Sequence, residues 1–228
     1  LAAHGCKFKM IKGYGMCELG STVATETSSY RKYCTAGFPM INVTVSVFDI
    51  ETNQELKYGQ RGEIRAFSPA VMLYYYNREQ ATADFFVEDA QGRKWGRTGD
   101  IGYMDEDGFI FIDGRSTDVF ITPAGKRIYN FDVEEVIMHN ENIFQCEVIG
   151  VPNQNGSELL TAFLILKEGA AASVETIIRD LSDACRAKLG DDSVPKQYKL
   201  LDSFAVNISG KRDIDGLRNT KDGFISVK

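Results

Sequence analysis

The sequence predicts an α+β fold: a small twisted β-subdomain followed by a compact α+β domain. Short strand signals with turn residues between them crowd the first half, which is typical of a partly closed sheet. After residue 115 the pattern changes to strongly apolar strands alternating with helices. With 228 residues, 43% of them apolar, the chain can fill two cores, and we expect domains at 1–114 and 115–228.

The first half has several weak signals before its clear ones. Within 1–12 we expect a helix end followed by an alternating strand at 7–12. A glycine-punctuated loop at 13–20 and a further loop at 21–42 should follow. Gly15 in the first loop would let backbone approach a ligand closely, and Tyr14 and Glu18 are its chemical candidates. A solvated turn glutamate is the alternative for Glu18. Clearer elements follow, namely strands at 43–49 and 62–67 and a helix at 79–86.

A hairpin is expected around 101–112, where two apolar runs flank the turn 105–108 that ends in glycine. Asp100 lies in a Gly-flanked turn before this hairpin and Arg115 follows it, so the two should come close together. A carboxylate can accept hydrogen bonds from two neighbouring hydroxyls, and a guanidinium can contact phosphate, which indicates a nucleotide. A plain Asp–Arg salt bridge is the alternative.

The second half reads as a module of about a hundred residues. We expect Asn130 to cap a helix whose first turn is acidic, as the helix dipole prefers. Apolar strands are predicted at 146–151 and 159–166. Ser173 should cap a second helix, which has one apolar stripe and stops at Gly190.

Lys211 lies in an expected exposed turn, 207–213. The Gly-Lys pair does not fit the spacing of a phosphate-binding loop, because Ala205 stands where that loop needs its first glycine. The turn is therefore expected to present a single lysine. An ordinary surface lysine is the alternative.

Composition excludes several function classes. The net charge of −6 and the absence of a basic run argue against nucleic acid and against an anionic membrane surface. Five cysteines without metal-ligand spacing and two histidines make a zinc site improbable and favour reduced thiols in a cytoplasmic protein. No apolar run reaches the length of a membrane span, and no signal peptide is visible.

Taken in order, these motifs resemble the C-terminal part of the adenylate-forming enzymes, which include acyl-CoA synthetases, luciferases and peptide-synthetase adenylation domains. Acyl-CoA ligases are the most similar group. The matching segments are Tyr14-Gly-Met-Cys-Glu18, Gly62-Glu-Ile64 with Tyr75-Tyr-Asn77, Arg97-Thr-Gly-Asp100, Gly114-Arg-Ser-Thr-Asp118 and Ser209-Gly-Lys211. The sequence departs from the family pattern at Cys17, at Thr117 and in the segment 123–126.

The resemblance implies activation of a carboxylic acid by ATP as acyl-AMP, followed by transfer to coenzyme A. It assigns Asp100 and Arg115 to the ribose and phosphates, Tyr14 and Gly15 to the adenine side, and Glu18 to Mg²⁺. Lys211 would be catalytic, bridging the substrate carboxylate and the α-phosphate on a mobile lid formed by 115–228.

The resemblance also implies that residues 1–114 are the end of the large AMP-binding domain. The family's phosphate loop and most of its acyl pocket lie upstream, so we expect an N-terminal part of the same polypeptide as partner and no activity for this chain alone. The alternatives are a peptide-synthetase-type adenylation domain and a non-catalytic nucleotide-binding relative. A homodimer through the surface that the missing part would cover is a third reading.

Overall fold

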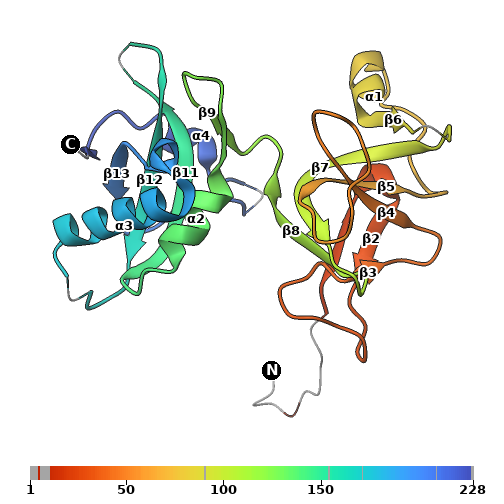
Figure 1. Cartoon of the computed structure of the whole chain (residues 1–228), viewed down its shortest axis with the longest axis horizontal. Coiled ribbons are helices and arrows are strands. Elements are labelled where there is room, and N and C mark those ends of the chain that lie inside the picture. The colour runs from red at the N-terminus through yellow and green to blue at the C-terminus, as the bar shows by residue number, and fades with distance from the viewer. Residues whose placement is uncertain are drawn as a thin grey trace. The chain divides into compact units, whose positions relative to one another are not determined.

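The computed structural model describes residues 5, 11–89, 91–153, 155–170, 172–208 and 210–226. The chain divides into two compact units, Leu1–Thr117 and Asp118–Lys228. Both units mix strands and helices, which confirms the α+β class (Figure 1). The two units are described separately.

The described residues of unit 1 form two antiparallel sheets and one α-helix. The first sheet has the order β1-β2-β3, formed by Gly13–Met16, Ser21–Thr25 and Phe38–Pro39. The second has the order β4-β5-β7-β6, with β8 paired to β7. Its strands are β4 (Thr44–Phe48), β5 (Gly62–Phe67), β6 (Phe86–Glu88), β7 (Lys94–Met104) and β8 (Ile110–Arg115), and the helix α1 is Glu79–Phe85. Apolar residues from both sheets and from α1 fill one core, including Leu19, Val23, Ile64, Phe85 and Ile110.

Several expectations for unit 1 are confirmed and others are wrong. β4, β5 and α1 lie where predicted, to within one residue at each end. The segment 13–20 is not a loop, since it forms β1 and a 3₁₀ turn at Cys17–Leu19, and β2 and β3 lie within the expected loop 21–42. β1 is half glycine, β2 is mostly Ser and Thr, and β3 has only two residues, so pairing with a neighbour defines these strands. In the strand expected at 7–12, residues 7–10 lie outside the described residues, and Ile11 and Lys12 belong to no strand.

β7 is longer than the predicted strand, and Asp100 lies inside it instead of in a turn. The early part of β7 pairs with β6 and β5, and its later part pairs with β5 and β8. Pairing with β5 and β6 thus extends β7 back to Lys94, which the local pattern around 96–99 does not reveal. At Gly102 the neighbouring strand approaches so closely that a Cβ would overlap the carbonyl oxygen of Phe111.

Unit 2 is built on a four-stranded sheet of order β11-β12-β13-β14, formed by Ile143–Pro152, Glu158–Leu166, Gln197–Leu200 and Ile225–Ser226. β12 and β13 are parallel and the other neighbours are antiparallel. Helices α2 (Asn130–Met138) and α3 (Val174–Leu189) pack with one set of strand residues in the larger core. A smaller core contains Ile149 of β11 and Leu217 of α4 (Ile214–Arg218). Val148, the residue before Ile149, belongs to the larger core, because successive side chains of a strand point to opposite faces of the sheet. Outside the sheet, β9 (Val119–Ile121) and β10 (Arg127–Tyr129) pair, and Asp191–Ser193 forms a 3₁₀ turn.

Helix ends in unit 2 test the capping expectations. The Ser173 hydroxyl accepts a hydrogen bond from the Thr176 amide at 3.3 Å, and α3 ends at Gly190 with φ of 92°, as predicted. Asn130 is not a cap, because it is the first residue of α2 and is buried, and Tyr129 precedes it without a side-chain cap. In the part of the chain that the structure describes, no helix is long and apolar enough to cross a membrane.

Buried titratable groups gather beside β11. The partly buried carboxylate of Glu134 accepts a hydrogen bond from the Val148 amide at 2.8 Å. Desolvation is the larger effect and raises the pKa of Glu134 from 4.5 to about 7. Burial also raises the pKa of the Cys146 and Cys185 thiols, to about 12 and about 11, whereas Cys17 and Cys34 are exposed.

Replacing Gly102 by Ala should lower the free energy of unfolding of unit 1 by about 2–4 kcal/mol, because backbone must move to admit the methyl group. Trp95, the only tryptophan, is buried in β7, so its fluorescence during denaturation reports on unit 1. Gly13→Ala is the matched control, since a Cβ there meets its nearest atom at 4.0 Å. Equal stability of the two variants would contradict the close approach.

Glu134 should make the stability of unit 2 depend on pH. Because the folded state holds the proton more tightly, this contribution is present below about pH 4.5 and is lost as pH rises to about 7. Glu134→Gln should therefore flatten that part of the profile and give a relative gain of about 1–2 kcal/mol at pH 8. Urea denaturation followed by circular dichroism measures it, with exposed Glu135→Gln as control. If the stabilities of wild type and Glu134→Gln depend on pH in the same way, the raised pKa of Glu134 in the folded state is contradicted.

Candidate functional site

Asp100 and Arg115 are in direct contact in unit 1. They are paired residues of β7 and β8, and Arg115 Nε lies 3.0 Å from Asp100 Oδ1. Arg115 Nη1 also donates a hydrogen bond to the Thr98 carbonyl oxygen at 3.0 Å. The proximity expected from the hairpin is therefore confirmed, while the ligand roles of both residues stay predictions.

Tyr14 supplies the second contact to the same carboxylate. Its hydroxyl donates a hydrogen bond to Asp100 Oδ2 at 2.6 Å, so residues 86 positions apart meet at one group. Burial, and then the hydrogen bond to Asp100, raise the pKa of Tyr14 well above its ordinary value, which keeps the phenol protonated as a donor. The side chain of Asp100 is 10% exposed and that of Arg115 is 57% exposed, so the guanidinium forms the open edge of the cluster.

Gly15 has a structural reason to be glycine. A Cβ there would overlap the Ser21 carbonyl oxygen, at the point where the β1–β2 register shifts. The close approach is thus between two strands, and Gly15 itself is exposed. The expected contact between Gly15 and a ligand stays a prediction.

Glu18 lies in the 3₁₀ turn that follows β1. Its Oε1 accepts a hydrogen bond from the Tyr75 hydroxyl at 2.7 Å, and its carbonyl oxygen accepts one from the Met72 amide at 2.7 Å. Burial, and then the bond to Glu18, raise the pKa of Tyr75 to about 12. Glu18 is therefore a fixed, half-buried carboxylate. No group of three or more His, Cys, Asp or Glu side chains suited to a metal ion occurs among the residues described.

Lys211 belongs to unit 2, where it is exposed at the end of a tight turn. The Lys211 amide donates to Asn207 Oδ1 at 3.0 Å, and the Asn207 amide donates to the Lys211 carbonyl oxygen at 2.7 Å. The expected exposed turn is therefore present. Ser209 of the same motif lies outside the described residues.

The structure brings Tyr14, Asp100 and Arg115 together, and it places Glu18 on the turn directly after β1. Two further residues escaped the sequence reasoning. Tyr75 fixes Glu18, and Arg212 binds the strand beside the Lys211 turn. Tyr75 begins the motif Tyr75-Tyr-Asn77, which could have drawn attention to it. Arg212 directly follows the proposed catalytic Lys211, and that position could have marked it as a candidate.

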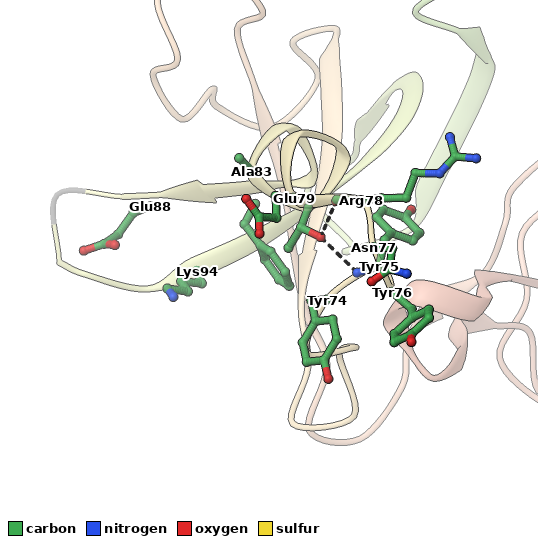
Figure 2. Close-up of a pocket in the computed structure, with 11 residues that line it drawn as sticks. Tyr74, Tyr75, Tyr76, Asn77, Arg78, Glu79, Ala83, Glu88 and Lys94 are labelled. Atoms are coloured by element: carbon green, nitrogen blue, oxygen red, sulfur yellow. Dashed lines mark hydrogen bonds between the residues drawn. The ribbon is translucent and has the colours of Figure 1, made fainter.

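A pocket of about 740 Å³ lies elsewhere in unit 1, between the segment 74–79, α1, β6 and β7. Figure 2 shows Tyr74 and Tyr76 pointing the same way from this segment, with Glu88 and Lys94 coming from the β6–β7 side. The Thr82 hydroxyl closes the segment by accepting from the Tyr75 amide and donating to the Arg78 carbonyl oxygen, both at 2.9 Å. None of the predicted site residues lines this pocket.

Two family models match the chain in order. The AMP-binding enzyme model matches residues 1–76, and the model of the AMP-binding enzyme C-terminal domain matches residues 132–211. Together they cover more than half of the chain, and the Asp100–Arg115 hairpin lies between the two matched ranges.

Similar proteins include ligases that span much more sequence. A 2-succinylbenzoate–CoA ligase of Bacillus licheniformis is 34% identical over 90% of this chain and 41% of its own length. A fatty acid–[acyl-carrier-protein] ligase, ScoC of Streptomyces coeruleorubidus, is 32% identical over 92% of this chain and 39% of its own. The crystal structure of ATP-bound MatB from Rhodopseudomonas palustris shares 27% identity and a TM-score of 0.75, covering 91% of this chain and 40% of that one.

This chain thus spans about two fifths of the length of the curated relatives it matches. The two family models match successive parts of the chain, and the relatives align along almost all of it. The chain belongs to the AMP-binding, adenylate-forming enzyme family.

Proposed function

We propose that this chain acts as the C-terminal part of an ATP-dependent acid–thiol ligase, which forms an acyl-AMP and passes the acyl group to coenzyme A. The observation that carries the proposal is the Asp100 carboxylate, held by Tyr14 on one oxygen and by Arg115 on the other. Family membership and the ligase names of the relatives support the reaction class. The rest of the polypeptide would supply the phosphate loop and the acid pocket.

In this proposal Asp100 accepts hydrogen bonds from the two ribose hydroxyls of the nucleotide. Each carboxylate oxygen has a second lone pair, so Asp100 can bind hydroxyls while it keeps its protein donors. The side chain of Asp100 is only 10% exposed, which strengthens such hydrogen bonds. The exposed guanidinium of Arg115 uses Nε for Asp100 and one N–H of Nη1 for the Thr98 carbonyl oxygen, so its remaining N–H groups can contact ribose or phosphate oxygens.

Glu18 is the proposed ligand of Mg²⁺. Mg²⁺ in nucleotide sites is commonly held by one or two carboxylates together with phosphate oxygens, so a single carboxylate is sufficient. Tyr75 holds Oε1 of Glu18, and this contact would restrict the carboxylate that binds the ion. The ion would offset the charge on the phosphates of ATP.

Lys211 is the proposed catalytic residue. As the substrate carboxylate attacks the α-phosphorus and pyrophosphate leaves, two negatively charged groups, the carboxylate and the α-phosphate, are brought together. An ammonium placed between them stabilises that transition state. The exposed turn of unit 2 leaves this side chain available to a site in the rest of the enzyme, with residues after Arg115 forming the moving lid.

The thiol acceptor has a second candidate. ScoC is by name a fatty acid–[acyl-carrier-protein] ligase, and its similarity to this chain makes a carrier protein the alternative to coenzyme A. Thioester formation assayed with each acceptor decides between them. A cytoplasmic location is part of the same proposal.

Replacing Lys211 by Ala in the intact ligase should reduce acyl-adenylate formation by several powers of ten, or about 3–5 kcal/mol in barrier, and leave ATP binding measurable. Pyrophosphate exchange measures the rate and isothermal titration measures the binding. Lys188→Ala, an exposed lysine of α3, is the matched control and should behave as wild type. Pyrophosphate exchange at the wild-type rate in Lys211→Ala would contradict the catalytic role of Lys211.

Replacing Asp100 by Ala should weaken ATP binding by about tenfold to a hundredfold, because hydrogen bonds from ribose to a charged group are lost. Tyr14→Phe keeps the carboxylate and should weaken binding less. Asp107→Ala, in the exposed tip of the same hairpin, is the control. Titration calorimetry on the intact ligase gives the comparison, and unchanged affinity in Asp100→Ala would remove the ribose role.

A further inference from the structure

The turn that carries Lys211 is a small hairpin closed by backbone hydrogen bonds. Val206 and Arg212 form an antiparallel bridge, and the Asp213 amide donates to the Ala205 carbonyl oxygen at 2.9 Å. Gly210 allows the reversal with φ of +77°. The pairing of the two arms of the hairpin is therefore defined, but its orientation on unit 2 needs a further contact.

Apolar packing supplies little of that contact. Val206 is 64% exposed and Ile208 is fully exposed, so the apolar side chains of the hairpin lie in solvent. Lys211 is exposed, whereas the neighbouring Arg212 is half-buried and donates a hydrogen bond to β11. Arg212 is thus directed towards the body of unit 2.

The guanidinium of Arg212 makes three contacts there. Its Nη1 donates to the Cys146 carbonyl oxygen at 2.7 Å and binds the Glu147 carboxylate, both on β11. Its central carbon lies 4.4 Å from the centroid of the Phe204 ring. The side chain of Glu147 is only 17% exposed, so this ion pair is sheltered more than a surface pair.

We infer that Arg212 is a positioning residue, which fixes the direction of Lys211 by clamping the hairpin to β11. The inference rests on the proposed catalytic role of Lys211. A planar fork that binds a carbonyl, a carboxylate and a ring at once restricts rotation of the hairpin, and a lysine could not make the same set of contacts. Precise placement matters because a shift of about 1 Å in a reacting group can lower a rate a hundredfold.

The test compares the two half-reactions in the intact ligase. Arg212→Ala should lower the rate of acyl-adenylate formation about a hundredfold, with the KM for ATP changed less than about twofold. Thioester formation from pre-formed acyl-adenylate should stay within about twofold of wild type, because Lys211 acts only in the first step. Arg212→Lys keeps the charge opposite Glu147 and should recover about tenfold.

Controls separate this inference from the function on which it rests. Arg179→Ala, 69% exposed on α3, should leave both half-reactions unchanged. If Lys211→Ala keeps its adenylation rate, the proposed function fails. If Lys211→Ala is inactive but Arg212→Ala adenylates at the wild-type rate, the positioning role is overturned. Equal losses in both half-reactions of Arg212→Ala would show a structural role only and overturn it as well.

Hydrogen exchange on the 228-residue chain tests the clamp without any activity. Arg212→Ala should speed exchange of the Asn207 and Asp213 amides about tenfold and leave the amides of β11 and β12 unchanged. Glu147→Gln, which keeps the shape but loses the charge, should give an intermediate effect. Unchanged exchange at the hairpin in Arg212→Ala would overturn the clamp.

Discussion

The register of the β7–β8 pair is the constraint on which unit 1 depends. It sets Asp100 opposite Arg115 and brings Gly102 against the backbone of the neighbouring strand. A shift by one residue would turn every side chain of β8 to the other face of the sheet and would separate the ion pair. The same strand β7 also pairs with β5 and β6, so the carboxylate sits on the most heavily bonded strand of the unit.

Tyr14 adds a constraint from a second sheet. β1 and β7 belong to different sheets, and the bond between Tyr14 and Asp100 connects them through a carboxylate that is mostly withdrawn from water. A buried charge is tolerated where donors surround it, and here a phenol and a guanidinium both donate. Contacts within the protein therefore already fix the cluster, and in the proposed nucleotide site this preorganisation would lower the entropy lost on binding.

Some of the fold was readable from local pattern and some was not. Apolar periodicity predicts β5 and α3, and for α3 the Ser173 cap and the glycine at position 190 also predict where the helix begins and ends. β1, β2 and the first half of β7 are glycine-rich or polar, and only their partner strands make them strands. In the candidate site, hairpin closure predicts that Asp100 meets Arg115. The contact of Tyr14 with Asp100 spans 86 residues, and no local rule could supply it.

The distribution of thiols divides the chain by chemical reactivity. The thiolate is the reacting form, and burial together with a raised pKa makes it scarce at Cys146 and Cys185 while both lie in the core of unit 2. Cys17 and Cys34 of unit 1 are open to solvent. Alkylation of the native chain should therefore mark Cys17 and Cys34 first, and labelling of Cys146 and Cys185 would require unit 2 to open.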